Sequence, residues 1–438
     1  MKEKGILLPI FSLPSKYGIG DFGNEAYEFI DILAENGIKY WEILPINACR
    51  HSPYSTVSYY ALNDDYLSLD KLQEYGLIGE IEQRENIDRA IYDDFKEKYY
   101  IEAYNNFKPS TGYLEFIKND EIVKYAMFRS EETGKEKEYF LFIQYILYKE
   151  WIDIKNYANS KGVEVIGDMP VYPTFKSVDT EFYPEWFQME NGQFTYEAGT
   201  PPDYFNQDGQ KWNCPVYDIE KMRKDNFSYF IKRFKYDLEL YDILRIDHFR
   251  GYDSYFRIPF GGSGKDGEYV DGASYDFFDE LFKQGVRIDE LIIEDLGDIR
   301  DETIALREHY NFTRLKIQEF CFDFDNLSDY DNESENVVVF PGSHDCNTIC
   351  GWYDELSDYQ KERLKEILRI NGCNTEQINV GVIEYCMKCK ARIVIVLAQD
   401  ILGLDGSKRT NLPGTVSDLN WSWKLVNFDE LKEKIKLF

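Results

Sequence analysis

Eight short apolar runs are distributed along the chain, and each of them ends in or near polar residues. The runs are rich in β-branched residues and mostly do not alternate between apolar and polar positions. Uninterrupted apolar runs of this length are typical of strands buried on both faces, as in a parallel sheet. The predicted strands are GILLPI (5–10), YWEILPI (40–46), VEVIGDMP (163–170), DILRID (242–247), LIIEDL (291–296), LKIQEF (315–320), VVVFPG (337–342) and RIVIVLAQD (392–400).

Stretches with apolar residues at helical spacing separate many of these runs. The clearest predicted helices cover 23–38, 273–285 and 357–372. Strands that alternate with helices in this way predict the α/β class and a (β/α)8 TIM barrel, which takes about 250 residues.

The remaining length must lie in insertions. We expect one at roughly 47–162, between predicted strands two and three, and another at roughly 171–235, between strands three and four. Neither a repeat nor a long flexible linker is visible, so the sequence predicts a single domain over residues 1–438 with helical and loop insertions.

The composition narrows the classes of partner. The chain has 50 Lys and Arg against 80 Asp and Glu, which gives a formal net charge of −30. Such a surface repels phosphate backbones and anionic lipids, so we expect no nucleic-acid and no membrane partner. Aromatic residues make up 16% of the chain. Their flat faces suit sugar rings, although a Tyr-rich core explains the same count.

The cysteines and the N-terminal segment indicate the cellular compartment in which the protein is expected. The 8 cysteines are scattered and form no dense disulfide framework, so reduced thiols in a cytoplasmic protein are expected. Cys386 and Cys389 make one CxxC pair, but a zinc site needs a matching second pair, so we interpret them as helix-facing thiols. The N-terminal apolar run is too short for a signal peptide, and no run approaches the roughly 20 residues of a membrane span.

Three carboxylates stand at or after the carboxyl ends of predicted strands. Asp247 ends one strand, Glu294 lies near the end of the next, and Asp345 follows VVVFPG. The carboxyl ends of the strands carry the active site in barrel enzymes. Acidic residues also begin ordinary loops, but three of them after different strands favour a functional site.

Glycoside cleavage requires two carboxyl groups in different protonation states. Arg245 lies two residues before Asp247, so both point to the same side of a strand, and a guanidinium there favours an ionised Asp247 with a lowered pKa. Glu294 lies in an apolar strand, where desolvation raises the pKa of a carboxyl group. Asp295 is expected to point to the opposite face.

His248 and His344 are adjacent to two of these acids, and the chain has only 4 histidines. Neutral imidazoles beside carboxylates suit hydrogen bonding to sugar hydroxyls, while a purely structural role is the alternative for each. The sequence shows no cluster with metal-ligand spacing, so we predict no metal and no other cofactor.

The segments taken in order resemble the amylomaltase or disproportionating-enzyme family, the 4-α-glucanotransferases of the α-amylase clan. The resemblance covers nearly the whole chain outside the first insertion, and the combination of motifs is highly specific. Its motifs include GILLPIFSLPSKYGIGDFG (5–23), SPYSTVSYYALNDDYLSLD (52–70), GDMPVYPTFKSVDTEFYPEWF (167–187), GTPPDYFNQDGQKW (199–212), LRIDHFRGYDSYFRIPFG (244–261), IIEDLG (292–297), GSHDCNT (342–348) and NLPGTVSDLNWSWKL (411–425).

The resemblance implies one (β/α)8 catalytic domain without a C-terminal β-sandwich. It implies Asp247 as nucleophile, Glu294 as general acid and base, and Asp345 as the group that binds sugar hydroxyls and stabilises the transition state. It implies transfer of α-1,4-glucan segments from maltooligosaccharide donors to glucose or another glucan, with no cofactor. The positions that it implies for substrate binding are Arg245, His248, His344, Tyr54, Asp203, Gln210, Trp212 and Asn411.

The chain departs from the family pattern at two places. The family follows GQ-x-W with Gly-Asn-Pro, whereas this chain has Asn213, Cys214 and Pro215. The family's His-Asp-Asn-Asp-Thr appears here with Cys346 and Asn347 after the acid. Three alternatives stay open at this point: an α-amylase-like hydrolase, a non-catalytic glucan-binding protein and a metal-dependent barrel enzyme.

Overall fold

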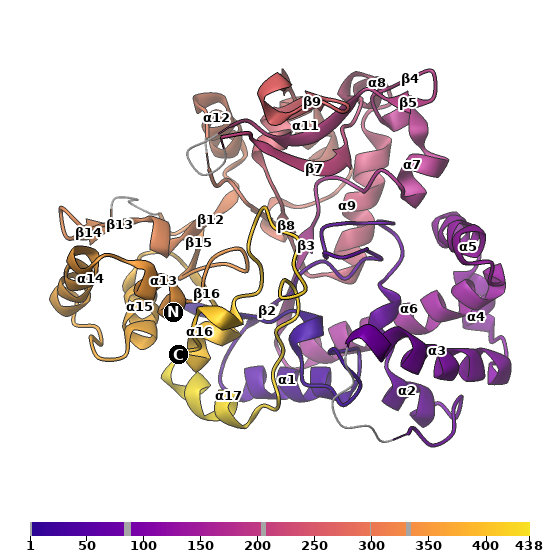
Figure 1. Cartoon of the computed structure of the whole chain (residues 1–438), viewed down its shortest axis with the longest axis horizontal. Helices are drawn as coiled ribbons and strands as arrows, with labels where there is room; N and C mark the ends of the chain where they lie inside the picture. Colours follow the sequence, from indigo (N-terminus) through magenta and orange to yellow (C-terminus); the bar gives the residue numbers. More distant parts are fainter. Residues whose placement is uncertain (1, 83–88, 203–206, 298, 330–333) are drawn as a thin grey trace. The chain divides into compact units, whose positions relative to one another are not determined.

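All eight predicted strands form the barrel. The structure is a computed structural model that describes residues 2–82, 89–202, 207–297, 299–329 and 334–438. Its strands close into a parallel barrel in the order β1-β16-β15-β12-β11-β8-β3-β2, which confirms the (β/α)8 class (Figure 1). The strands are β1 (Glu3–Leu7), β2 (Tyr40–Glu42), β3 (Glu164–Met169), β8 (Ile243–Ile246), β11 (Leu291–Ile293), β12 (Thr313–Ile317), β15 (Val337–Phe340) and β16 (Ile393–Leu397).

The barrel strands are buried along most of their length. Every residue of β15 and β16 is buried, and these two strands pair in parallel with Val338 opposite Ile393. Their Val, Ile, Leu and Phe side chains pack on both faces of the sheet, and this is why the sequence shows unbroken apolar runs there.

The three helices with the clearest pattern are also confirmed, each slightly shorter than predicted. They are α1 (Asn24–Glu35), α11 (Ser274–Lys283) and α14 (Asp358–Ile370). Phe277, Phe278 and Leu281 of α11 are buried, as the helical spacing requires. A capping box between Ser357 and Gln360 sets the start of α14.

The chain divides into two compact units. The first comprises residues 1–44, 154–166 and 313–438, and holds β1, β2, β12, β15 and β16. It also holds a short hairpin of β13 (Phe322–Asp323) and β14 (Ser328–Asp329), and several C-terminal helices. Those helices are α13 (Ile349–Glu355), α14, α15 (Ile378–Lys388), α16 (Ala398–Leu402) and α17 (Asp429–Lys434).

The second unit comprises residues 45–153 and 167–312, and includes β8 and β11. Helices make up most of the described part of the first predicted insertion, whereas the second holds short strands as well as helices. The helices are α2 (Leu69–Glu74), α3 (Arg89–Asn106), α4 (Thr111–Phe116), α5 (Asp120–Thr133) and α6 (Lys137–Ser160), which runs on to the residues before β3. α7 (Val178–Phe182), α8 (Ile219–Lys224) and α9 (Ser228–Leu240) lie between β3 and β8, and α10 (Arg250–Asp253) and α12 (Asp301–Tyr310) follow β8 and β11.

A four-stranded antiparallel sheet is the main feature of the second unit that the sequence pattern does not predict. Its order is β10-β9-β6-β7. Residues 199–215 begin at the end of β6 and finish in β7. The strands are β6 (Tyr196–Thr200), β7 (Gln210–Pro215), β9 (Ser254–Pro259) and β10 (Glu268–Asp271). Antiparallel pairing of β6 with β7 supplies the backbone hydrogen bonds that make this segment extended.

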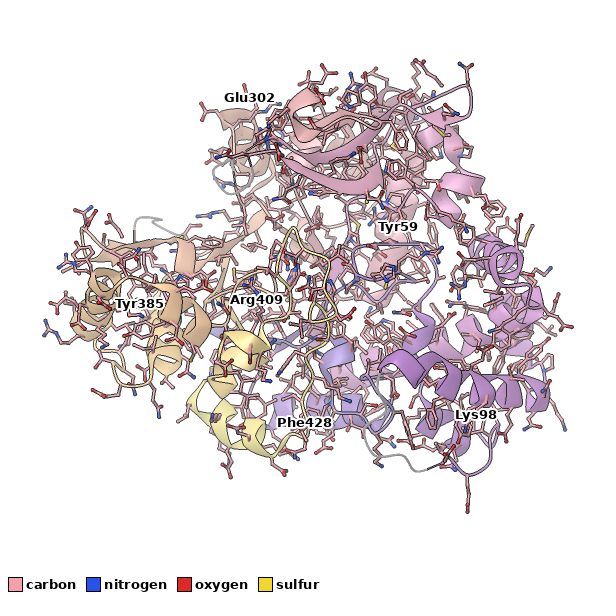
Figure 2. All side chains as sticks on the ribbon, in the orientation of Figure 1. Tyr59, Lys98, Glu302, Tyr385, Arg409 and Phe428 are labelled. Carbon is pink, nitrogen blue, oxygen red and sulfur yellow. The ribbon has the colours of Figure 1, made fainter. Side chains whose placement is uncertain are left out.

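A shared apolar core joins the two insertions. Tyr125 and Phe128 of α5 pack in one buried cluster with Val57 and with Val178 of α7, and Phe182 lies against it. The side chains of the described residues are drawn in Figure 2, in which Tyr59 of this unit is labelled. Among the described helices, none combines the length and the apolarity that a membrane crossing needs.

Candidate active site

The three predicted carboxylates all follow barrel strands. Asp247 comes directly after β8, and Glu294 comes directly after β11. Asp345 lies in the turn between β15 and α13. The parallel register pairs Ile246 with Ile293, so Asp247 and Glu294 extend neighbouring strands from paired positions. This places both acids of the second unit at the same end of adjacent strands.

Backbone hydrogen bonds fix the Glu294 carboxylate. The His248 N–H donates to Glu294 Oε2 at 2.7 Å, and the Leu296 N–H donates to Oε1 at 3.3 Å. The main chain of Glu294 is held as well, because its N–H donates to Ile246 O at 3.0 Å. The segment that carries Asp247 and His248 therefore also orients Glu294.

Burial controls the protonation of Glu294. Desolvation raises the pKa of this carboxyl above its usual range, as the apolar strand predicts. The Arg245 charge and the N–H groups of His248 and Leu296 act in the opposite direction, and the Asp295 charge adds to the rise. Asp295 itself pairs with Arg307 of α12 at 2.6 Å, so the two consecutive acids have different partners.

Arg245 has a buried ionic partner that the sequence does not single out. Its Nη1 lies 3.2 Å from Asp168 Oδ2 at the end of β3, and both side chains are almost fully buried. The Tyr54 hydroxyl donates to the same Asp168 oxygen at 2.8 Å. Asp168 thus ties together two predicted substrate-binding residues. The sequence signal that could have identified Asp168 is its charge inside the mostly apolar run VEVIGDMP.

We expect Asp168→Asn to lower the free energy of unfolding by about 3 kcal/mol, because it removes one charge of a buried ion pair. Urea unfolding measures this. Asp289→Asn is the matched control, because Asp289 pairs with Arg287 on the surface with 68% of its side chain exposed, and such pairs contribute about 1 kcal/mol or less. Equal losses in the two variants would contradict a structural role for the Asp168–Arg245 pair.

His248 is held in an uncommon backbone conformation. Its φ is +49°, in the left-handed region. Its ring meets the edge of Trp212 with 4.9 Å between ring centroids. Burial, reinforced by the Arg250 charge, lowers the pKa of His248 to about 4, so its imidazole is neutral at physiological pH. A neutral ring presents one donor and one acceptor.

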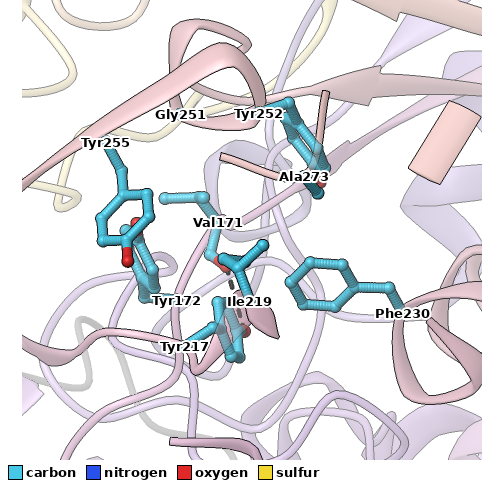
Figure 3. A pocket seen from close by; sticks show the side chains of 9 residues that line it. All are labelled: Val171, Tyr172, Tyr217, Ile219, Phe230, Gly251, Tyr252, Tyr255 and Ala273. Atoms are coloured by element: carbon cyan, nitrogen blue, oxygen red, sulfur yellow. Dashed lines mark hydrogen bonds between the residues drawn. The ribbon is translucent and has the colours of Figure 1, made fainter. Parts of the chain in front are cut away.

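A small aromatic cavity lies next to His248 in the same unit (Figure 3). Tyr172, Tyr217, Tyr252 and Phe230 line it together with Gly251. A methyl group on Gly251 would come within 3.1 Å of the His248 ring, so the glycine leaves room for this side chain. The cavity wall supports the segment on which His248 stands.

Gln210 and Trp212 lie on β7. Gln210 is opposite Thr200 in the β6–β7 pair, and the Trp212 ring lies 6.4 Å from that of Tyr172. Cys214, a departure from the family pattern, is buried on the same strand. Asp203 lies outside the described residues.

The first unit brings together Asp345, His344 and Asn411. The Asn411 side-chain amide donates to Asp345 Oδ1 at 2.7 Å, and its backbone N–H donates to His344 O at 3.1 Å. His344 Nε2 lies 3.5 Å from Asp345 Oδ2. The Asp345 side chain is 48% exposed, whereas that of His344 is 2% exposed. An accessible acid thus stands on a buried turn.

Arg409 is a second residue that the sequence does not single out (labelled in Figure 2). Its guanidinium donates to Asn411 O at 2.7 Å and to Asp345 O at 3.1 Å. It therefore links the segment that carries Asn411 to the turn that carries Asp345. Sequence alone offers no signal for this role, because the partners are backbone oxygens.

The described residues contain no group of three or more His, Cys, Asp or Glu side chains arranged to hold a metal ion. The chemistry that the described side chains can perform is acid, base and nucleophilic chemistry by carboxylates, with the neutral His248 imidazole and side-chain amides available for hydroxyl groups.

Known proteins match this chain over nearly its whole length. A family model described as 4-alpha-glucanotransferase matches residues 8–137 and 129–429. The 4-alpha-glucanotransferase of Aquifex aeolicus is 33% identical, and the alignment covers 100% of this chain and 98% of the relative. That of Clostridium butyricum is also 33% identical, with 97% of each chain covered.

A solved structure gives the same result. The amylomaltase from Streptococcus agalactiae in complex with acarbose superposes with a TM-score of 0.93 at 29% identity, over 100% of this chain and 98% of that one.

Proposed function

The chain belongs to the 4-alpha-glucanotransferase family, and on that premise we propose that it transfers glucan segments through a covalent glycosyl-enzyme formed on Asp247. The observation that carries the proposal is the pair of strand-end acids in the second unit, of which Glu294 has its pKa raised by burial. Its substrates are α-1,4-glucans and maltooligosaccharides, with glucose or a glucan as acceptor.

The first displacement cleaves the donor. The Asp247 carboxylate attacks the anomeric carbon while the bond from that carbon to the leaving O4 breaks. Glu294 gives its proton to this oxygen, and the shortened glucan leaves with a free 4-hydroxyl. The remaining segment is bound to Asp247 through a β-glycosidic ester.

The second displacement forms the new bond. Glu294, now ionised, takes the proton of an acceptor 4-hydroxyl, and the oxygen attacks the anomeric carbon. The bond to Asp247 breaks, so the α configuration is restored and both carboxyl groups return to their starting states. In this proposal Asp345 binds sugar hydroxyls and stabilises the charged transition state.

Five residues are proposed to hold the sugar at the cleavage site. Tyr54 stacks on it, while Arg245 and the neutral His248 ring contact its hydroxyls. The support for these three is their joint anchoring, since Tyr54 and Arg245 share Asp168 and His248 holds Glu294. His344 and Asn411 serve the same function around Asp345, to which both side chains are adjacent.

Asp203, Gln210 and Trp212 are proposed to line the acceptor side. Trp212 presents a flat apolar ring, which suits the C–H face of a sugar. An acceptor held there in place of water is what favours transfer over hydrolysis. The Cys214 departure lies two residues further along β7, so we expect it to affect acceptor preference more than cleavage.

Incubation with maltotriose tests the proposed function. A ladder of glucose, maltose and longer oligomers is expected, with a nearly constant number of reducing ends. Asp247→Ala is the control in which the ladder disappears. An increase in reducing ends without longer products would indicate an α-amylase-like hydrolase, and glucan binding without turnover would indicate a non-catalytic protein.

We propose that acarbose inhibits this chain as a ligand of the same site. The support is the S. agalactiae amylomaltase structure, which holds acarbose and matches the whole chain. Calorimetric titration is expected to show binding that competes with maltotriose. Binding that leaves the transfer rate unchanged at saturation would place acarbose elsewhere.

We also propose a cytoplasmic location. All eight cysteines are free thiols in the structure, and thiols persist in reducing compartments. Fractionation of the source cells tests this, and recovery of the protein outside the cytoplasm would contradict it.

A further inference from the structure

The loop that follows β9 packs on the residues that directly precede β7. This loop comprises residues 261–267, Gly-Gly-Ser-Gly-Lys-Asp-Gly, and contains the short helix η4 (Gly264–Asp266). Asp266 fixes its shape, because its carboxylate accepts the Ser263 N–H at 2.8 Å and the Ser263 hydroxyl at 2.9 Å. We call residues 261–267 the brace. The transfer mechanism gives the brace no role, although it borders the strand on which acceptor-side residues are proposed.

Two glycines let the brace approach the start of β7 closely. A methyl group on Gly264 would come within 2.4 Å of Asp208 O and 2.8 Å of Gly209 Cα. Gly209 itself has a φ of +73°, and a methyl group there would meet Thr200 O at 2.6 Å and Gly264 Cα at 3.1 Å. Neither position accepts a larger residue unless the backbone shifts, so the two segments are packed directly against each other.

Lys211 links the brace to β6 and β7 at the same place. Its Nζ atom lies 2.6 Å from Glu197 Oε1 of β6, and it donates to Gly262 O of the brace at 3.0 Å. The Glu197 side chain is 6% exposed, so Lys211 supplies a positive charge to a carboxylate that has little contact with water. Loss of one partner from such a pair leaves an uncompensated buried charge. One ammonium group thus connects both strands to the brace.

Lys211 stands between the two described residues that are proposed to line the acceptor side. Gln210 and Trp212 flank it on β7, and Lys211 is opposite Gly199 in the antiparallel pair of β6 and β7. Successive side chains of a strand point to opposite faces of the sheet. The Lys211 anchor therefore fixes the backbone that carries both neighbours, and it does so from the other face of the sheet.

We propose that Lys211 is a positioning residue for the acceptor, which together with the brace fixes β7 and so sets how often the glycosyl-enzyme reacts with a sugar instead of with water. The inference rests on the proposed function and on the acceptor side proposed for Gln210 and Trp212. Water attacks without a sugar-binding site, whereas glucose must be held with its 4-hydroxyl at the anomeric carbon. A small displacement of β7 therefore costs transfer more than hydrolysis.

Partitioning of the glycosyl-enzyme between glucose and water tests the proposal. α-Maltotriosyl fluoride is the donor, because fluoride leaves without a proton from Glu294, and glucose in excess is the acceptor. The initial rate of maltotetraose formation reports transfer, and that of maltotriose formation reports hydrolysis.

Lys211→Met keeps the side-chain stem and removes the ammonium group. It is expected to lower the ratio of transfer to hydrolysis about tenfold. Both products come from one intermediate, so the ratio does not depend on the fraction of enzyme that is folded. A purely structural role for Lys211 would lower both rates equally and leave the ratio unchanged.

Lys265→Met is the matched control, since it makes the same exchange within the brace. Lys265 pairs with Asp208 at 2.5 Å, but the two side chains are 59% and 80% exposed. Exposed pairs contribute little, so the ratio is expected to stay within about twofold of the wild-type value. Lys211→Arg keeps a cation with its donors, and is expected to recover most of the ratio that Lys211→Met loses.

Gly264→Ala tests the brace with every charge in place. The added methyl group must push the brace away from Gly209, so the ratio is expected to fall about as far as in Lys211→Met. Gly79→Ala is the control for this exchange, because a methyl group there would lie 3.6 Å from Glu102 Oε1, which is an ordinary contact. Its ratio is expected to equal that of the wild type.

The positioning role is overturned if Lys211→Met keeps the wild-type ratio, or if Lys265→Met loses as much as Lys211→Met. It is also overturned if Gly264→Ala partitions like the wild type, or if Lys211→Arg is as poor as Lys211→Met. A wild-type protein that forms no maltotetraose at any glucose concentration would instead reject the proposed function. Normal transfer by the wild type beside an unchanged ratio in Lys211→Met would leave that function intact and reject this inference alone.

Discussion

Asp247→Ala is expected to lower kcat for maltotriose disproportionation by at least about 10⁴-fold while the fold is retained. The substitution removes the proposed nucleophile, and Glu294 alone can then do no more than protonate the leaving oxygen. Asp247 is half-buried at the end of β8 and is not part of the core, so loss of its carboxylate leaves the strand pairing in place. Steady-state product analysis measures kcat, and circular dichroism checks the fold.

Asp242→Ala is the matched control, because Asp242 lies at the opposite end of the same strand, just before Ile243. A change of about twofold or less is expected there. Azide gives a second readout. In Asp247→Ala it enters in place of the missing carboxylate and attacks an α-linked donor directly, which yields a β-glycosyl azide. An α-glycosyl azide from this variant would mean that another residue forms the covalent bond.

The barrel could be predicted from the sequence because the pattern that identifies each strand lies within a short stretch of consecutive residues. Strands such as β15 and β16 are buried on both faces and therefore read as unbroken apolar runs. The positions of Asp247 and Glu294 follow directly, since the runs end where the acids begin. The chemistry assigned to these acids came from the resemblance, which the family match supports.

What could not be predicted depends on pairing between distant segments. The sheet of β6, β7, β9 and β10 joins residues on either side of β8, and nothing in the pattern around Trp212 says which strand it pairs with. The ion pair of Asp168 with Arg245 crosses between two strands in the same way.

Glu294→Gln is expected to lower kcat for maltotriose by about 10²- to 10⁴-fold, the usual contribution of a positioned acid and base. The glutamine keeps the size of the side chain and can still accept the N–H groups of His248 and Leu296. What it cannot do is give a proton to the leaving oxygen. Cleavage of α-maltotriosyl fluoride is therefore expected to lose much less than cleavage of maltotriose.

The pH dependence of kcat/KM provides a second test of the role of Glu294. Wild-type kcat/KM for maltotriose requires protonated Glu294, whose pKa burial raises, so the rate is expected to fall as pH increases through that raised pKa. Glu294→Gln has no such proton to lose, and this alkaline fall should disappear from its residual activity.

Azide is expected to accelerate the turnover of α-maltotriosyl fluoride by Glu294→Gln, because a small anion needs no base to attack the glycosyl-enzyme. The product is then an α-glycosyl azide, opposite in configuration to that of Asp247→Ala. The same anomer from both variants would show that the two carboxyl groups do not divide the reaction as proposed, because only a nucleophile on one side and an acid and base on the other give opposite outcomes.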